Sequence, residues 1–246
     1  MGEFWALNRT QDLKRKKMTR VTKNILKIAL ISLCCVGSVV AHENPTKAQQ
    51  IKQYLSIANK AYDQQDYDKA FTYFQKAADL GSVKGYVGLG DLYSDYDSGF
   101  SDYAQALFYY KKAGDLGNAE AYFNLGYLYN VGGDCDRFGC AVKPDNKKAL
   151  QYFKKAGDMG YAAGYLDAGL MYEGDEGIPK DYAKAMQYYQ KAADMGEVAA
   201  YSNLGIMYAH GKGVRRDIEK ARQYYQKACN MGFDTSCWLL KELLKH

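Results

Sequence analysis

The sequence predicts an all-α solenoid built from stacked antiparallel helix hairpins. Two observations predict it: a short motif recurs at a nearly fixed period, and glycines recur at two fixed places within the period. The motif is a pair of aromatic residues, one variable residue and then Lys-Ala, and it occurs five times. The closing alanines, Ala77, Ala113, Ala156, Ala192 and Ala228, lie 36, 43, 36 and 36 residues apart. A period in this range is typical of helical repeat proteins, in which each unit buries its apolar face against the next.

The first 41 residues differ from the rest in charge and in hydropathy. They hold eight Lys or Arg residues against two acidic ones, and they end in a mostly apolar run of 14 residues, Ile28 to Ala41. This is the pattern of a secretory signal peptide, with Met18 as the expected start and cleavage expected after Ala41. A membrane-spanning helix needs about 20 residues, and this apolar run is shorter. We therefore expect the leader to be removed, and membrane contact only through the leader if it is not cleaved. The remaining domain, 42–246, would be periplasmic or secreted.

Outside the leader the net charge almost vanishes. The whole chain has 33 Lys or Arg and 28 Asp or Glu residues, of which 25 and 26 lie after residue 41. Domains that bind nucleic acid present a basic stripe on their folded part. We therefore expect no nucleic-acid partner.

The expected array begins with a capping helix over 47–64 and continues with five hairpins over 66–245. In the first helix of each hairpin the apolar residues share one face, as Ala70, Phe74 and Ala77 do in the first unit. A glycine is expected to end each first helix in the left-handed conformation, which only a residue without Cβ adopts freely. These glycines are Gly81, Gly117, Gly160, Gly196 and Gly232.

A further glycine lies inside four of the five second helices, at Gly90, Gly126, Gly169 and Gly205. A glycine within a helix costs up to about 1 kcal/mol relative to alanine. Its recurrence therefore predicts that a neighbouring helix approaches too closely for a methyl group. The last second helix, Cys237 to Lys245, lacks this element, as we expect for a terminal unit that has no successor to pack against.

Four cysteines follow the leader: Cys135, Cys140, Cys229 and Cys237. An even number in an exported protein predicts two disulfides, and local pairing is favoured because the two couples lie far apart in an elongated array. A four-cysteine zinc site would need all four sulfurs around one ion. We therefore expect no metal site.

The order of these elements resembles the Sel-1-like repeat family, a relative of the tetratricopeptide repeat. The run Gly205-Ile206-Met207-Tyr208-Ala209-His210-Gly211-Lys212-Gly213-Val214-Arg215-Arg216-Asp217 is close to the family consensus, and the segment 58–70 is more like the tetratricopeptide version. The resemblance covers nearly all of the chain after the leader. It implies a right-handed superhelical solenoid whose usual role is to hold a partner.

A subset of this family, the exported Helicobacter cysteine-rich proteins, carries a cysteine pair in every repeat. Cys229 and Cys237 match that arrangement, so the resemblance implies a disulfide that closes the last hairpin. The earlier units carry other pairs at these positions: Ala78/Tyr86, Gly114/Tyr122, Gly157/Tyr165 and Ala193/Tyr201. From this subset we carry over export and a scaffold character.

The 43-residue spacing places seven extra residues between Tyr129 and Ala149. Insertions in solenoids map to loops on one face, often the binding face. We therefore expect a loop over 130–144, closed by a Cys135–Cys140 disulfide, as a candidate recognition element. It would present Asp136, Arg137 and Phe138. The alternative is a tolerated surface loop with a stabilising bridge.

A second candidate surface, the first-helix stripe, consists of the residues turned away from the packed face of each first helix. Its members are Thr72, Gln75, Lys76, Asp79, Phe108, Lys111, Lys112, Asp115, Gln151, Lys154, Lys155, Asp158, Gln187, Gln190, Lys191, Asp194, Gln223, Gln226, Lys227 and Asn230. By analogy with tetratricopeptide arrays, the stripe suits an extended peptide or a polar envelope component. The partner contacts are expected at Gln151, Lys154, Gln187, Gln190, Gln223 and Gln226. The alternative is a solvated face that serves solubility.

Sequence motifs for catalysis are missing after the leader. Some family members have been described as binding or hydrolysing β-lactams, and serine β-lactam chemistry uses Ser-x-x-Lys, Ser-Asp-Asn and Lys-Thr-Gly. Residues 42–246 contain none of the three, and their histidines are only His42, His210 and His246. We therefore expect a non-enzymatic exported adaptor that binds a protein or peptide and uses no cofactor. The alternative is a protein that binds or hydrolyses β-lactams or peptidoglycan fragments.

Overall fold

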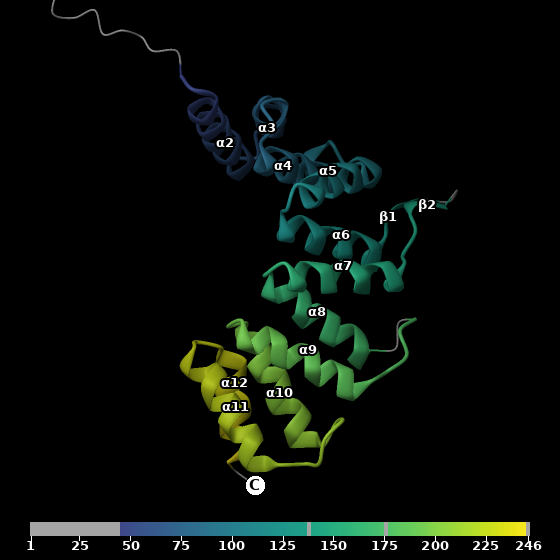
Figure 1. The fold of residues 1–246 in the computed structure, drawn as a ribbon, viewed down its shortest axis with the longest axis vertical. Coiled ribbons are helices and arrows are strands. Elements are labelled where there is room, and N and C mark those ends of the chain that lie inside the picture. Colours follow the sequence, from purple (N-terminus) through teal and green to yellow (C-terminus); the bar gives the residue numbers. More distant parts are fainter. Residues whose placement is uncertain (1–44, 137–138, 175–176, 245–246) are drawn as a thin grey trace, which may run out of the picture. The chain divides into compact units, whose positions relative to one another are not determined.

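The computed structural model describes residues 45–136, 139–174 and 177–244, with the side chains of 134–141 excepted. The predicted leader, 1–41, lies outside the described residues, and so do Arg137 and Phe138. The signal peptide, its start and its cleavage site therefore stay predictions. From Lys47 onward the chain forms one compact unit (Figure 1).

The part of the chain that the structure describes contains eleven α-helices. The capping helix α2 spans Lys47–Asp63, and five hairpins follow, which we number units 1 to 5. Each unit pairs a first helix with a second helix: α3 (Tyr67–Asp79) with α4 (Val83–Ser94), α5 (Tyr103–Asp115) with α6 (Ala119–Val131), α7 (Asn146–Asp158) with α8 (Ala162–Glu173), α9 (Tyr182–Asp194) with α10 (Val198–His210), and α11 (Ile218–Asn230) with α12 (Asp234–Leu243). A short 3-10 turn, η1 (Tyr96–Ser98), joins α4 to α5.

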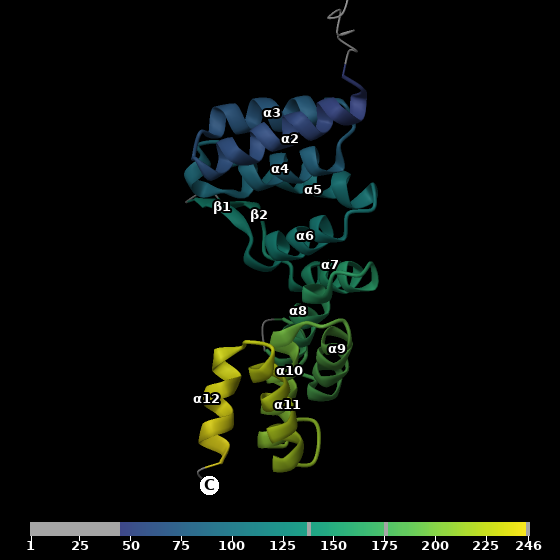
Figure 2. The same ribbon diagram turned by 90° about the vertical axis from the view of Figure 1, so that its left-hand side faces the viewer.

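Every helix of this array packs against the helix before it and the helix after it in the sequence. Figures 1 and 2 show the units following one another in chain order. The buried side chains form clusters that adjacent units share: one cluster contains Tyr165 of α8, Tyr189 of α9 and Ala228 of α11. The predicted fold class, an all-α array of stacked helix hairpins, is confirmed.

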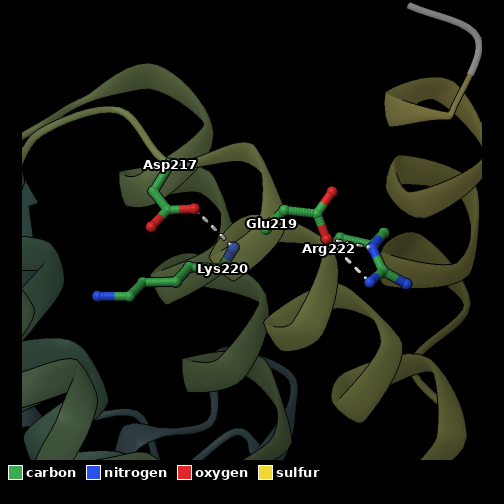
Figure 3. A network of polar contacts seen from close by, with 4 residues as sticks. All are labelled: Asp217, Glu219, Lys220 and Arg222. Carbon is green, nitrogen blue, oxygen red and sulfur yellow. Dashed lines mark hydrogen bonds and ion pairs between the residues drawn. The ribbon is translucent and has the colours of Figure 1, made fainter.

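An aspartate begins each first helix. The carboxylates of Asp66, Asp102, Asp145, Asp181 and Asp217 each accept a hydrogen bond from the backbone N–H three residues later. Figure 3 shows this cap in α11, where the amide of Lys220 donates to Asp217 at 3.0 Å and Arg222 donates to Glu219 within the same turn. Such caps satisfy an amide that the start of a helix leaves without a partner. They fix where each unit begins.

The glycines that end the first helices adopt the predicted left-handed conformation. Their φ angles are 79° at Gly81, 94° at Gly117, 99° at Gly160, 91° at Gly196 and 89° at Gly232. The chain therefore turns in the same way between the two helices of every unit.

The glycines inside the second helices explain how one unit docks on the next. A Cβ atom built on Gly169 would lie 2.6 Å from the Tyr189 ring of the following first helix, and real Cβ atoms essentially never come so close to another atom. The same contact joins Gly90 to Tyr110, Gly126 to Phe153, and Gly205 to Tyr225. The predicted close approach is therefore made by an aromatic ring. We call this the ring–glycine contact.

The inserted segment contains regular structure in place of the loop that we predicted over 130–144. Helix α6 continues to Val131, and strands β1 (Gly133–Asp136) and β2 (Gly139–Val142) then pair antiparallel, with Cys135 opposite Cys140. Strand β2 lies near α5 (Figure 2), and Gly133 packs closely against the Tyr103 ring at the first residue of α5. The backbone groups of the insertion pair with each other, which a spacing argument alone does not predict.

The last second helix departs from the others at the positions that dock a further unit. In α12, Lys241 stands at the position of Gly205 in α10, and Cys237 stands at the position of Tyr201. Cys237 forms a disulfide with Cys229 of α11, with the two Cα atoms 4.7 Å apart. Helix α12 is therefore held to its hairpin by a covalent bond. It lacks the helical glycine that, in the other second helices, leaves a notch for the aromatic ring of the next unit.

Replacing Cys229 and Cys237 by serine is expected to lower the free energy of unfolding by about 2–3 kcal/mol, because the bridge closes a short loop and restricts the unfolded chain. Urea denaturation under oxidising conditions measures the difference. A reductant should destabilise the wild-type protein by a similar amount and affect the double variant much less. Coincident midpoints of the two proteins under oxidising conditions would contradict the prediction.

Candidate partner-binding surface

Tyrosine rings stack in threes at the four junctions between units. Tyr188 of α9 lies between two tyrosines of α8: its ring centroid is 5.6 Å from that of Tyr172 and 5.9 Å from that of Tyr165. The equivalent triplets are Tyr86–Tyr109–Tyr93, Tyr122–Tyr152–Tyr129 and Tyr201–Tyr224–Tyr208. These triplets account for half of the 24 tyrosines of the chain, which therefore serve packing.

Lysines lie against both ends of these triplets. At the junction of units 3 and 4, the ammonium of Lys191 is 4.9 Å from the centroid of Tyr165, and that of Lys184 is 5.3 Å from the centroid of Tyr172. The same pair occurs as Lys155 with Lys148 and as Lys227 with Lys220, whereas the first junction has Lys112 at one end. Such contacts contribute about 0.5–1 kcal/mol each at exposed sites. They hold the lysines of the first-helix stripe in fixed positions.

The predicted partner-binding residues lie on the surface in successive units. Gln151, Gln187, Gln223 and Gln226 are exposed, and Lys154 and Gln190 are half-buried. Gln190 donates to Asp194 at 2.7 Å within its own helix. Gln226 donates to Asn230 in the same way.

The stripe continues from one unit to the next. The Tyr224 hydroxyl of unit 5 donates to the side-chain oxygen of Gln190 in unit 4 at 3.2 Å. The ammonium of Lys154 in unit 3 lies 5.8 Å from the centroid of the Tyr188 ring in unit 4. The Tyr188 side chain raises the pKa of Lys154. The stripe is thus a connected polar surface across units 3 to 5.

The stripe carries more positive than negative charge. It contains seven lysines and four aspartates, and four of the lysines belong to units 2 and 3. In unit 2, Lys111 forms an ion pair with Asp115 at 2.8 Å, and 63% of the Lys111 side chain remains exposed. An acidic partner could therefore still reach this ammonium.

The insertion stands apart from the residues predicted in the stripe. Asp136 ends strand β1, but its side chain is among those not described, and Arg137 and Phe138 lie outside the described residues. The strand pair reaches the first residue of α5, Tyr103, whereas Gln151 and Lys154 lie on α7.

An exposed apolar row was missed by the sequence analysis as a candidate surface. The residue before each glycine that ends a first helix is apolar, and in units 2 to 5 it is exposed: Leu116 (55%), Met159 (39%), Met195 (40%) and Met231 (45%). The signal in the sequence was the Leu or Met that precedes each of these glycines, which predict only the helix end. We call these four residues the Leu/Met row.

Two carboxyl groups on second helices have pKa values well above those of exposed aspartates. Burial raises the pKa of Asp91 to about 6, although the Tyr110 hydroxyl donates to it at 2.8 Å and opposes the shift. Burial likewise raises the pKa of Asp167 to about 6, with a smaller contribution from Glu197. Both groups favour the protonated form more in the folded chain than in the unfolded one.

The stability of the protein should therefore depend on pH through Asp91. Between about pH 4 and pH 6 the folded chain holds a proton that the unfolded chain has lost, so the free energy of unfolding falls as the pH rises. Asp91→Asn, which keeps an acceptor for Tyr110, should raise the free energy of unfolding at pH 7 by about 2 kcal/mol. Urea midpoints at pH 4.5 and pH 7 test this. An equal pH dependence in the variant and the wild type would contradict it.

Within the described ranges, no three His, Cys, Asp or Glu side chains are placed to hold a metal ion. None of the described helices is long and apolar enough to cross a membrane.

Fold and surface together define a helical repeat protein whose units dock through aromatic rings and share a polar stripe. The chain belongs to the Sel1 repeat family. The Sel1 repeat matches residues 62–82, 84–118, 119–161, 162–197 and 198–233. The resemblance found in the sequence is confirmed.

Two solved structures illustrate the likeness. A Sel1 repeat protein from Oxalobacter formigenes is 28% identical, with a TM-score of 0.64, over 78% of this chain and 76% of its own. The protein c5321, a protective antigen present in uropathogenic Escherichia coli strains, is 30% identical, with a TM-score of 0.67, over 82% of this chain and 42% of its own.

A curated relative shares a shorter stretch. HcpC of Helicobacter pylori, named as a candidate beta-lactamase, is 30% identical over 76 residues, which are 31% of this chain and 24% of HcpC. The chain thus spans about a quarter of the length of HcpC. The similarity to the Helicobacter cysteine-rich proteins is distant.

Proposed function

We propose that the protein is a non-enzymatic adaptor that binds a protein or peptide partner along the first-helix stripe. The observation that carries the proposal is the continuity of the stripe, in which Gln190 is hydrogen-bonded to a tyrosine of the next unit and Lys154 lies against the ring of another. Side chains that are already held in place lose little conformational entropy when a partner binds. A segment running across several units would meet such side chains in each of them.

The charge of the stripe favours a partner segment rich in Asp or Glu. Seven lysines against four aspartates give it an excess of positive charge, and complementary charge speeds encounter and sets the register of binding. The Leu/Met row could receive apolar residues of the same partner, because methionine side chains adapt to different contact surfaces. The partner is thus expected to combine acidic and apolar residues.

The strand pair of the insertion is proposed as a second contact, closed by a Cys135–Cys140 disulfide. The two residues are directly opposite in the strand register. Opposite residues of antiparallel strands have Cα atoms about 4.5–5.5 Å apart, which lies within the range that a disulfide requires. Such a bridge would hold the strands β1 and β2 together.

We also propose that the protein acts in the periplasm or outside the cell. The Cys229–Cys237 disulfide supports an oxidising compartment. The pattern of residues 1–41 supports export.

Affinity capture from an envelope extract of the source cells tests the adaptor role. The stripe variant replaces Lys111 and Lys154 by glutamate, and the control variant replaces Lys60 and Arg215, exposed residues away from the stripe, by glutamate. A captured protein is then identified and its affinity measured for each purified variant.

We expect the stripe variant to bind the partner with at least tenfold lower affinity than the wild type, and the control variant to bind it with the wild-type affinity. Equal binding by the wild type and the stripe variant would overturn the role of the stripe. A loss confined to a variant without 133–142 would assign binding to the insertion alone.

The alternative, β-lactam hydrolysis, has one observation in its favour: the 76-residue match to HcpC, named as a candidate beta-lactamase. Incubation of the purified protein with a chromogenic cephalosporin tests it. We expect no turnover above that of buffer. Turnover that copurifies with the protein and disappears when it is unfolded would favour the alternative.

A further inference from the structure

The first unit begins the array without a glycine notch for its aromatic ring. Helix α2 packs on α3 in the way that a second helix packs on the next unit. The ring centroids of Tyr54 and Tyr73 are 5.9 Å apart, and the ammonium of Lys76 lies over both rings. In this alignment Ala58 takes the place of the notch glycine. Phe74 therefore has no notch in α2.

The Phe74 ring packs instead on Gly88 of its own unit, where a Cβ atom would lie 2.6 Å from the ring carbon Cζ. Later units carry Asn124, Asp167 and Asn203 at the position of Gly88. Without a side chain there, the surface above the Phe74 ring stays open.

A cavity of about 310 Å³ lies at this place, between α2, α3, α4 and the start of α6. Leu55, Phe74 and Val87 contribute apolar side chains to its lining, and Asp91 and Glu120 contribute carboxylates. A smaller cavity of about 110 Å³ also borders Asn59, Phe74 and Asp91. The size and the mixed lining of the larger cavity suit a small organic group.

The carboxylate of Asp91 breaks the pattern of the repeat. Units 2 to 4 carry Tyr127, Leu170 and Ile206 at its position. Asp91 is half-buried, and moving a carboxylate partly out of water is costly. Such local departures are concentrated at functional sites. Its carboxylate accepts a hydrogen bond from the Tyr110 hydroxyl, and among the described residues it forms no ion pair.

The junction of units 3 and 4 contains a similar tyrosine–carboxylate pair with a cation added, although Glu173 there stands at the position of Ser94, one turn after that of Asp91. There the Tyr189 hydroxyl donates to Glu173 at 2.9 Å, and the ammonium of Lys212 donates to the other oxygen of Glu173 at 2.6 Å. A lysine ammonium can thus complete a tyrosine–carboxylate pair in this chain. Asp91 has no such ion pair among the described residues, and a cavity lies beside it.

We propose that the cavity beside Asp91 binds a primary alkylammonium group, supplied by a free amine or by a lysine side chain of another molecule. The ammonium would donate to Asp91 as Lys212 donates to Glu173, and Glu120 would add negative charge. Phe74, Leu55 and Val87 would contact the methylene stem. A divalent cation fits less well, because the described residues provide no third acidic or histidine ligand. This site is separate from the first-helix stripe.

Lys84 gives the proposal a sharp test, because it also lines the cavity and its ammonium would compete with the ligand. Asp91→Asn should weaken binding, since it removes the charge and keeps an acceptor for Tyr110. Lys84→Ala should strengthen it. Asp68→Asn, at an exposed acid on α3 away from the cavity, should leave it unchanged. A purely structural role of Asp91 predicts no effect of these variants on amine binding.

Calorimetric titration of the full chain at pH 7.5 compares three probes: n-pentylamine, Nα-acetyl-lysine amide and n-pentanol. We expect saturable binding of at least one amine, at least tenfold weaker binding to Asp91→Asn, tighter binding to Lys84→Ala and no binding of the alcohol. Tighter binding of the lysine amide would identify a lysine side chain as the source, and tighter binding of pentylamine a free amine. Absence of saturable amine binding, or equal affinities of wild type and Asp91→Asn, would overturn the proposal.

Discussion

Replacing Tyr189 by alanine should lower the free energy of unfolding by about 3–5 kcal/mol, because a large buried aromatic side chain is lost and a cavity remains. The side chain is fully buried at the junction of units 3 and 4. Its ring fills the notch at Gly169 and belongs to a cluster that reaches from α8 to α11. Urea denaturation followed by circular dichroism measures the effect.

Tyr189→Phe is the matched control for this substitution. It keeps the ring and removes only the hydroxyl that donates to Glu173, which retains Lys212 as a partner. A loss of about 1 kcal/mol is expected. Unit 3 already carries phenylalanine, Phe153, at the equivalent position. Equal losses for the alanine and phenylalanine variants would show that the hydroxyl, and not the ring, holds the junction.

Replacing Gly169 by leucine should cost about 3 kcal/mol, at the upper end of what overpacking a buried contact costs. Even the first atom of the new side chain would lie 2.6 Å from the Tyr189 ring. The gain in helix propensity from losing a glycine, about 1 kcal/mol, opposes this cost and does not outweigh it. The same denaturation experiment measures the net effect.

Gly174→Ala controls for a glycine substitution at the end of the same helix. A Cβ there would meet its nearest neighbour, the Leu170 carbonyl oxygen, at an ordinary 3.5 Å. A change within about 0.5 kcal/mol is expected, as for other substitutions away from packed contacts. If Gly169→Leu were as mild as Gly174→Ala, the recurring glycines would need another explanation.

The repeat itself could be predicted from the sequence because its physical causes are local. Gly81 and its equivalents end helices through a backbone conformation, and Gly90 and its equivalents signal a close contact by the cost of placing glycine in a helix. Ring partners such as Tyr189 for Gly169 could not be assigned, because the pairing depends on how one unit sits on the next.

The candidate surfaces could be predicted only in part. The exposed side of the first helices followed from the apolar face, and Gln151, Gln187 and Gln223 lie there as expected. The half-burial of Lys154 and Gln190 was not foreseen, because it depends on tyrosines of the next unit that contact them. The strand pair was missed, since a spacing of 43 residues shows that residues are added but not how they pair.

The cavity beside Asp91 depends on two features that lie apart in the sequence. Ala58 of α2 denies the Phe74 ring a notch, and Gly88 of α4 receives it. Neither residue is unusual by itself. Their relation became visible only when α2 was found to pack as a second helix.

A double-mutant cycle at Gly169 and Tyr189 tests the ring–glycine contact, on which this account of the array rests. Removing the ring should make room for the leucine, so the variant with both Gly169→Leu and Tyr189→Ala should lose less stability than the two single variants together. A coupling energy of at least about 1 kcal/mol is predicted, as for residues in direct contact. Strictly additive losses in free energy of unfolding would contradict it, because they would mean that the ring and the glycine act independently.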